Sequence, residues 1–237
     1  MRSQNYISLF IKNTPMEICE KYLDDARKAL KGSVFSKPSP VEAIRSFEGA
    51  AQCFENSRSF ERAAQCYVDT ANLVIKMDPL KAAQMLEKAA TCIERMGGPS
   101  KEYYLKAASI YQGNAITLYR TQPDQGLQLL QKAAEAFEKG GDRGTAIHCY
   151  EVGAEASVKR NDYLNAVVFY GTAGQTFERN KEYKNAVKYY HKVARLWEIQ
   201  NIPENVAENY WRMAACLESA EEYDLSLIHI SEPTRPY

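Results

Sequence analysis

The chain has 237 residues, 45% of them hydrophobic, and its 30 basic residues balance its 30 acidic residues. A chain of this length and composition can bury a large core, as one elongated domain or as two compact ones. Zero net charge excludes a global field that would draw the protein to nucleic acid or to a membrane, so electrostatic recognition depends on local segregation of charge.

Residues 1–14 are expected to lie outside the folded part of the chain. Their apolar run, Tyr6 to Ile11, is too short for a secretory signal, and no later stretch reaches the length of a transmembrane helix. The sequence therefore predicts a soluble, cytosolic protein whose residues 1–14 form an extension that does not have to be ordered.

Helix signals begin at Thr14-Pro15 and return at Ser39-Pro40, each followed by an acidic residue at capping-box spacing. The segment KGSVFSKPSP at 31–40 lies between them and is predicted to be an irregular loop. Val34 and Phe35 are apolar and Lys37 is basic, a combination that can contact a membrane surface. The alternative is that Phe35 folds back against the next helix.

A template of small and large apolar residues recurs from residue 43 onward. Its offsets are 0 (small), 4 (large), 7 (small) and 11 (large), which place the four residues on one face of a helix. Copies begin at Ala43, Ala63, Ala82, Gly126, Ala146, Ala166, Ala186 and Val206. From Gly126 onward they are twenty residues apart. The segment Ser100–Tyr119 fits less well, and its helix is expected to continue through Leu118.

A helix of about fifteen residues and a short turn account for the period of twenty, so successive helices must be antiparallel. The predicted fold is all-α, an α-solenoid of antiparallel helix pairs over residues 15–222, related to tetratricopeptide (TPR) superhelices. It is not a standard tetratricopeptide array, because the pair period is near forty instead of 34 and the W-x2-L-G signature is absent.

Tyrosines at one template position form a series, Tyr150, Tyr170, Tyr190 and Tyr210. A stacking platform for a ligand is one interpretation. Their period of twenty on the apolar face favours packing in the core, and we expect all four to be buried.

The helix expected over 181–199 carries a basic stripe. Its cations, Lys181, Lys184, Lys188, Lys192 and Arg195, fall within about 80° of one another, nearly opposite the core face. Lys184, Lys188, Lys192 and Arg195 are the candidates for binding an acidic partner. The alternative is an ordinary solvated face, partly neutralised by Glu178 and Glu182.

The last residues, 223–237, break the helical rhythm with two prolines and an isolated His. They are predicted to lie outside the solenoid, as a disordered or non-native, vector-derived tail.

Six cysteines are spread along the chain without any C-x-x-C pair, which argues against a zinc site and against a disulfide framework. Cys53 and Cys66 occur in two copies of AAQC, but they occupy different parts of the template and are not expected to pair. All six are predicted to act as small apolar residues on helix faces. No metal or other cofactor is predicted.

Motifs of catalysis are missing from the sequence. It contains no Walker A loop, no G-x-S-x-G and no H-E-x-x-H, and its carboxylates are interspersed with Lys and Arg at helical spacing. We therefore expect no enzymatic activity and no catalytic residues.

The string FERAAQCYVDTANLVIKMDPLKAAQMLEKAATCIERMG at 60–97 resembles the soluble NSF attachment proteins (SNAPs), and their alpha type more closely than their gamma type. NDYLNAVVFYGTAG at 161–174 resembles a later repeat of that family. The resemblance covers roughly residues 15 to 224. Before Phe60 the chain has about one helix fewer than the family usually has. After Glu222 it lacks the C-terminal bundle and acidic, leucine-containing tail, so the resemblance implies a C-terminally truncated member.

The resemblance implies a peripheral membrane adaptor in vesicle trafficking and membrane fusion. Its partners would be the SNARE four-helix bundle (syntaxin-type proteins) and the hexameric AAA ATPase NSF, and Val34 and Phe35 would occupy the family's membrane-contact loop. The alternative is a TPR-like peptide-binding scaffold of the co-chaperone type, although the groove cations of a carboxylate clamp are not recognisable in the sequence.

Overall fold

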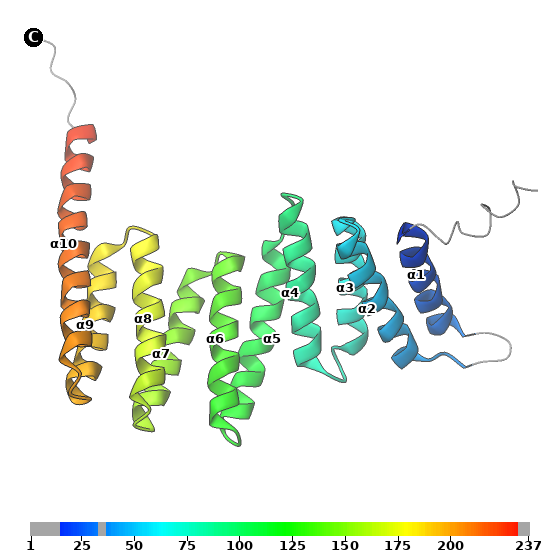
Figure 1. Ribbon diagram of the computed structural model, residues 1–237, viewed down its shortest axis with the longest axis horizontal. Helices are drawn as coiled ribbons and strands as arrows, with labels where there is room; N and C mark the ends of the chain where they lie inside the picture. The colour runs from blue at the N-terminus through cyan, green and yellow to red at the C-terminus, as the bar shows by residue number, and fades with distance from the viewer. Residues whose placement is uncertain (1–14, 33–36, 232–237) are drawn as a thin grey trace, which may run out of the picture. The chain divides into compact units, whose positions relative to one another are not determined.

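The computed structural model describes residues 15–32 and 37–231, with the side chains of 16–32 and 37–221. The regular secondary structure of these residues is entirely α-helical (Figure 1). The helices are α1 (Pro15–Lys31), α2 (Pro40–Asn56), α3 (Phe60–Val74), α4 (Pro79–Arg95), α5 (Lys101–Tyr119), α6 (Pro123–Gly140), α7 (Arg143–Lys159), α8 (Tyr163–Arg179), α9 (Tyr183–Ile199) and α10 (Pro203–Ser231).

Two compact units divide the chain, residues 1–143 and 144–237. In the first unit each helix from α1 to α5 packs on the helix that follows it, and in the second α9 packs on both α8 and α10. Figure 1 shows that consecutive helices within a unit run in opposite directions, joined by short turns. Each unit is therefore a stack of antiparallel helices, which confirms the predicted α-solenoid fold.

Local sequence signals explain where the helices start and stop. Side-chain oxygens of Ser39, Asp78 and Asp162 accept hydrogen bonds from backbone N–H groups three residues later, at 3.4, 2.9 and 3.2 Å. Left-handed residues follow the helix ends, including Gly141 at φ 87° and Asn161 at φ 58°. Ser39 thus caps the helix that the sequence predicts to begin at Pro40.

Small residues and tyrosines interlock in the core. Ala166, Ala173 and Ala186 have no exposed surface, and Tyr150, Tyr170 and Tyr190 are 0%, 8% and 1% exposed. The prediction for the fourth tyrosine was wrong, because Tyr210 is 44% exposed. In its helix, α10, Asn209, Cys216 and Ala220 are buried, and the template residue Leu217 is exposed like Tyr210, whereas the template residue Met213 packs against Ala186 and Tyr190 of α9.

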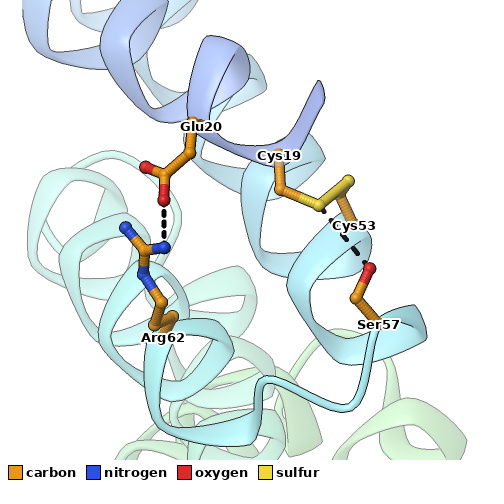
Figure 2. The surroundings of a disulfide bond; sticks show 5 residues. All are labelled: Cys19, Glu20, Cys53, Ser57 and Arg62. Carbon is orange, nitrogen blue, oxygen red and sulfur yellow. Dashed lines mark hydrogen bonds and ion pairs between the residues drawn. A yellow bond between two sulfur atoms is a disulfide. The ribbon is translucent and has the colours of Figure 1, made fainter. Parts of the chain in front are cut away.

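Cysteine pairing also differs from the prediction. Cys19 of α1 and Cys53 of α2 form a disulfide with their Cα atoms 5.3 Å apart, beside Ser57 (Figure 2). Near them Arg62 of α3 forms an ion pair with Glu20 of α1. The two cysteines lie 34 residues apart, but antiparallel packing of α1 on α2 brings them together. Cys66, Cys92, Cys149 and Cys216 are free and buried, as expected of small apolar residues.

Several predictions fall outside the described residues. These are the extension 1–14, the loop residues Val34 and Phe35, and residues 232–237 of the tail. The helix α10 continues to Ser231, so the predicted solenoid limit at residue 222 lies within it and stays a prediction. Among the described helices, none combines the length and the apolar character that a membrane crossing requires.

Candidate functional site

The predicted basic stripe lies on α9, in the second unit. Lys184, Lys188 and Arg195 are exposed to solvent. The Lys188 ammonium donates a hydrogen bond to the Asn185 side chain at 3.2 Å, and the Arg195 guanidinium lies 3.9 Å from Glu198. These contacts are local, within one helical turn, so the Lys188 and Arg195 side chains can reach an approaching partner without breaking packing between helices.

Lys192, the fourth predicted residue, has a different position. Its ammonium lies over the rings of Tyr170 and Tyr189, 4.6 and 5.0 Å from their centroids, and 3.9 Å from the Glu151 carboxylate. Because Tyr189 and Glu151 are themselves hydrogen-bonded, Lys192 is part of the contact of α9 with α7 and α8. Three of the four predicted cations are therefore exposed, and the side chain of the fourth, Lys192, is 43% exposed but also contacts α7 and α8.

The physical reason is that α9 has two buried sides. Ala186, Tyr190 and Val193 pack on one side as the template predicts, and Tyr189 and Leu196 are buried as well. A helix stacked between neighbours cannot keep its whole polar half in solvent, so a residue at the edge of the stripe becomes an interhelical contact.

The predicted membrane loop is described only at its ends. Lys37 is exposed, whereas Val34 and Phe35 lie outside the described residues. The Ser39 backbone N–H donates to the Ala29 carbonyl at 2.9 Å, which ties the start of α2 to the last turn of α1.

Sequence reasoning missed a repeated polar cluster. In each case a glutamate of one helix accepts a hydrogen bond from a tyrosine and meets a cation from another helix. The Glu55 carboxylate accepts a hydrogen bond from the Tyr67 hydroxyl at 2.9 Å and another from the Arg95 guanidinium at 3.1 Å. Burial, followed by the hydrogen bond to Glu55, raises the pKa of Tyr67, because the buried phenol ionises less readily beside a carboxylate.

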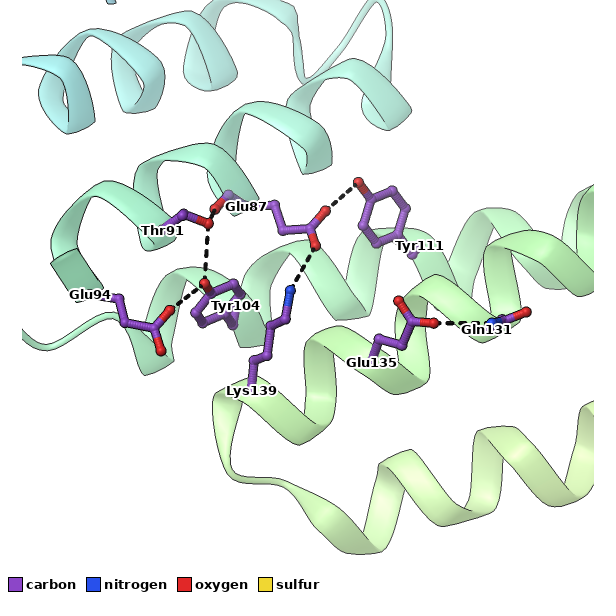
Figure 3. A network of polar contacts seen from close by, with 8 residues as sticks. All are labelled: Glu87, Thr91, Glu94, Tyr104, Tyr111, Gln131, Glu135 and Lys139. Carbon is purple, nitrogen blue, oxygen red and sulfur yellow. Dashed lines mark hydrogen bonds and ion pairs between the residues drawn. The ribbon is translucent and has the colours of Figure 1, made fainter. Parts of the chain in front are cut away.

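Figure 3 shows the largest such cluster, in the first unit. Glu87 of α4 accepts from the Tyr111 hydroxyl of α5 at 3.1 Å and lies 3.7 Å from the Lys139 ammonium of α6. Tyr104 donates to Glu94 at 2.9 Å and lies beneath Lys139. These polar contacts join α4, α5 and α6. The carboxylates of Glu87 and Glu94 therefore stabilise the packing of the three helices.

A groove in the second unit is lined by residues of α8, α9 and α10. Its volume is about 350 Å³. Tyr190, Val193 and Trp197 contribute apolar surface, and Asn205, Asn209 and Arg212 are among its polar lining residues. A Cβ at Gly171, which also lines the groove, would meet no atom within 4 Å, so the glycine leaves the groove open. Arg212 is held by Glu208 at 2.8 Å.

Metal-binding clusters were also sought among the described side chains. No three His, Cys, Asp or Glu residues of that part of the chain gather as a metal site would require. The polar clusters around Glu55 and Glu87 hold neighbouring helices together.

Comparisons with known proteins give one family. The family model of the soluble NSF attachment proteins matches residues 37–201. A search of curated protein sequences found no match.

Several solved structures of helical-repeat proteins are similar at low identity. BtubC (BKLC) from P. vanneervenii is 12% identical over 95% of this chain and 96% of that one, with a TM-score of 0.41. A Signal Transduction ATPase with Numerous Domains that has a tetratricopeptide repeat sensor, from Pyrococcus horikoshii, is 14% identical over 97% of this chain and 40% of that one, with a TM-score of 0.37. A kinesin light chain with nearly identical TPR-like repeats, from Podospora anserina, is 14% identical over 87% and 97%, with a TM-score of 0.31.

These scores are too low to assign the chain to any of those proteins, so the assignment depends on the sequence family. The matched region, residues 37–201, makes up more than half of the chain. The protein belongs to the soluble NSF attachment protein family.

Proposed function

We propose that this protein is an adaptor in vesicle trafficking and membrane fusion. It binds the SNARE four-helix bundle, including syntaxin-type proteins, and recruits the hexameric AAA ATPase NSF, whose ATP hydrolysis disassembles the bundle. The observation that carries the proposal is the family match over residues 37–201. On this proposal the protein supplies binding surfaces, performs no chemical step, and uses neither a cofactor nor nucleic acid.

The string at 60–97 supports the alpha type of the family. The proposed location is the cytoplasm, with peripheral attachment to membranes through the loop that contains Val34, Phe35 and Lys37. Weak attachment of this kind raises the effective concentration of an adaptor near membrane-anchored SNAREs without requiring tight binding to either.

The exposed cations of α9 are the proposed contact with the SNARE bundle. Lys184, Lys188 and Arg195 are exposed in the second unit, and the described contacts of Lys188 and Arg195 are within their own helix. A stripe of one charge sign favours docking to an acidic helical surface and speeds the encounter. Lys192 is less suitable, because it already contacts Tyr170 and Tyr189.

Co-sedimentation with assembled SNARE complex tests this surface. The variant Lys188→Glu/Arg195→Glu should bind at least about fivefold more weakly at low salt, and the difference should shrink as salt screens the charges. The matched control is Lys132→Glu/Lys159→Glu, which reverses two other exposed lysines. Equal binding by both double variants across the salt series would remove the α9 stripe from the interface.

Recruitment of NSF is measured in the same assay by adding the ATPase to the pellet fraction. An adaptor that retains SNARE binding should bring NSF into the pellet in proportion to its own amount. SNARE binding without any NSF in the pellet would contradict the proposed recruitment of NSF and leave only the proposed SNARE binding.

Membrane attachment is tested with SNAREs anchored in liposomes. The loop variant Val34→Ser/Phe35→Ser should lose SNARE disassembly on liposomes and retain it on soluble SNAREs, because only the first reaction benefits from attachment. Loss of both activities would contradict a membrane role.

A peptide-binding scaffold is the second candidate, and the groove of the second unit favours it. Val168, which is 49% exposed, and Trp197 could contact apolar side chains, while Asn205 offers an amide to a peptide backbone. The ion pair of Arg212 with Glu208 makes the groove a poor clamp for a terminal carboxylate. Binding of co-chaperone-type C-terminal peptides with loss on Asn205→Ala, together with absence of SNARE binding, would favour this function.

A further inference from the structure

The Cys19–Cys53 disulfide concentrates the thiol chemistry of the chain at one place, the contact of α1 with α2. The other four cysteines are buried and free, and they are Cys66, Cys92, Cys149 and Cys216. Burial raises the pKa of the Cys66, Cys92 and Cys216 thiols, so little reactive thiolate forms there near neutral pH. Oxidants and small thiols therefore act on the Cys19–Cys53 pair first.

A disulfide is unusual in the cytoplasm, the compartment proposed above for this protein. Small thiols keep most cysteines reduced there, and the disulfides that do form are usually transient, with a catalytic or a redox-sensing role. The pair lacks the C-x-x-C spacing of disulfide oxidoreductases, because 34 positions separate the two residues, and Cys19 has no exposed surface. Redox sensing is therefore the role that fits, and this step rests on the proposed cytoplasmic location.

The two sulfur atoms differ in their access to solvent. Cys19 is completely buried, whereas Cys53 is partly exposed. A thiolate arriving from solvent therefore attacks the Cys53 sulfur, and Cys19 leaves as a thiolate. The Ser57 hydroxyl lies 3.8 Å from the Cys19 sulfur, within hydrogen-bond distance for sulfur, and can donate to this leaving thiolate (Figure 2).

A second small thiol completes the reduction. Its thiolate attacks the small-molecule sulfur of the mixed disulfide on Cys53, so that the two small thiols become one disulfide and Cys53 leaves as a thiolate. Both cysteines then take up a proton. Two electrons have passed from the small thiols to the broken Cys19–Cys53 bond, and oxidised glutathione reverses both steps.

The noncovalent contact of α1 with α2 is narrow. Cys19, Leu23 and Ala26 are the buried side chains among the described residues of α1, at helical spacing along one stripe. A Cβ at Gly49 of α2 would lie 3.3 Å from the Tyr22 ring, so this ring packs on the Gly49 backbone, but Tyr22 is 45% exposed. A stripe of three buried side chains leaves the covalent bond a large share in holding α1.

The disulfide also restricts what α1 can do when that contact opens. With the bond intact, residues 19 to 53 remain a closed ring, so an opened α1 gains little conformational entropy. Without the bond, α1 can leave α2 as a local event, because α2 to α5 are each packed on the helix that follows them. Reduction therefore favours opening of α1 over unfolding of the whole unit.

We propose that the Cys19–Cys53 pair is a redox switch. Thiols of the glutathione class reduce it by attack at Cys53, and the reduced protein releases α1 from α2 while α2 to α6 remain folded. This regulation goes beyond the adaptor function proposed above.

Hydrogen exchange of the full chain, followed by mass spectrometry, tests the switch. Millimolar reduced glutathione should reduce the pair in the folded protein, and oxidised glutathione should restore it. Reduction should speed exchange of the α1 amides at least about tenfold and leave the α4 and α5 amides unchanged. The variant Cys19→Ser/Cys53→Ser should exchange at the fast rate with or without glutathione.

The order of attack is tested by the rate of reduction. Ser57→Ala removes the donor to the leaving Cys19 thiolate and should slow reduction by glutathione about threefold. Ser59→Ala is the matched control, because the Ser59 side chain makes no capping hydrogen bond, and should be reduced at the wild-type rate. Equal rates for the two variants would overturn the assignment of Cys19 as the leaving group.

Three results would overturn the switch itself. The first is free thiols at Cys19 and Cys53 in protein exposed to oxidised glutathione. The second is a bond that resists reduced glutathione in the folded protein, which would make it structural. The third is exchange of the α1 amides that reduction does not change. None of these measurements uses SNARE proteins, NSF or membranes, so failure of the switch is distinguishable from failure of the proposed adaptor function.

Discussion

The Tyr67 hydroxyl of α3 donates a hydrogen bond to the Glu55 carboxylate of α2 at 2.9 Å, and Arg95 of α4 reaches the other oxygen of that carboxylate at 3.1 Å. Replacing the tyrosine by phenylalanine keeps the ring in the core and removes one bond to a charged acceptor. We expect Tyr67→Phe to lower the free energy of unfolding by about 1.5 kcal/mol.

Urea unfolding followed by circular dichroism measures this change. Tyr22→Phe, at a 45% exposed position of α1, is the matched control and should change the free energy by less than about 0.5 kcal/mol. Because Arg95 shares the carboxylate, the double variant Tyr67→Phe/Arg95→Met should be non-additive. Equal effects of the Tyr67 and Tyr22 substitutions would show that the bond contributes nothing.

Alkaline pH should destabilise the fold through these same tyrosines. Burial, then hydrogen bonding to glutamates, raises the pKa of Tyr67, Tyr189 and Tyr190 above the usual value of about 10. Between that value and the raised pKa the unfolded chain has released the protons and the folded chain retains them, so stability is full below about pH 10 and falls as pH rises further.

The expected slope is about 1.4 kcal/mol per pH unit for each such tyrosine. Urea titrations between pH 8 and 11 measure it, and the triple variant with phenylalanine at 67, 189 and 190 should have a shallower slope. Stability that stays flat up to pH 11 would contradict the raised pKa values.

Reduction of the Cys19–Cys53 disulfide should destabilise the fold, because the unfolded chain gains conformational entropy when the cross-link is removed. For the 34-residue separation we expect a loss of about 2 to 4 kcal/mol in the first unit. Urea unfolding with and without dithiothreitol measures it, with Cys19→Ser/Cys53→Ser as the variant that should no longer respond.

Mass spectrometry after alkylation provides the chemical check. Burial raises the pKa of the Cys66 and Cys92 thiols to about 11, so neither should react in the folded protein at pH 7. Rapid labelling of Cys19 and Cys53 in the unreduced protein would mean that the bond is not formed.

Two glycines of the second unit should respond in opposite directions to alanine. A Cβ at Gly153 of α7 would lie 2.5 Å from the Phe169 ring of α8, so Gly153→Ala should destabilise by about 1 to 3 kcal/mol through overpacking. A Cβ at Gly171 meets nothing within 4 Å, so Gly171→Ala should stabilise by about 0.5 to 1 kcal/mol. Thermal unfolding of both variants measures the pair, and a change of the same sign in both would disprove the packing argument.

The helices were predictable because each carries its own signals. Pro15 and Pro40 begin helices at the predicted positions, and Pro79, Pro123 and Pro203 begin three more. Gly141 and Asn161 follow helix ends. The template also identified Tyr150, Tyr170 and Tyr190 as core residues. It could not show that Tyr210 is exposed, because apolar periodicity identifies a face and not the neighbour that covers it.

Contacts between helices were less accessible to sequence reasoning. Cys19 and Cys53 meet because two antiparallel helices pack in one register, which no spacing within a single helix encodes. Lys192 left the basic stripe because α9 has neighbours on two sides. One signal was present, since the pairs Glu55 and Tyr67, Glu178 and Tyr190, and Glu198 and Tyr210 all have a separation of twelve residues.

The left-handed turn residues Asn161, Lys181 and Asn201 have φ of 58°, 61° and 61° and stand twenty positions apart. Because these turns have the same conformation and a fixed spacing, the chain entering one turn could continue from any other turn of the series. Loss or duplication of forty residues between two such turns preserves both register and chain direction, whereas a change of twenty reverses the direction of everything that follows. We therefore expect evolution to alter the length of this architecture in whole hairpins.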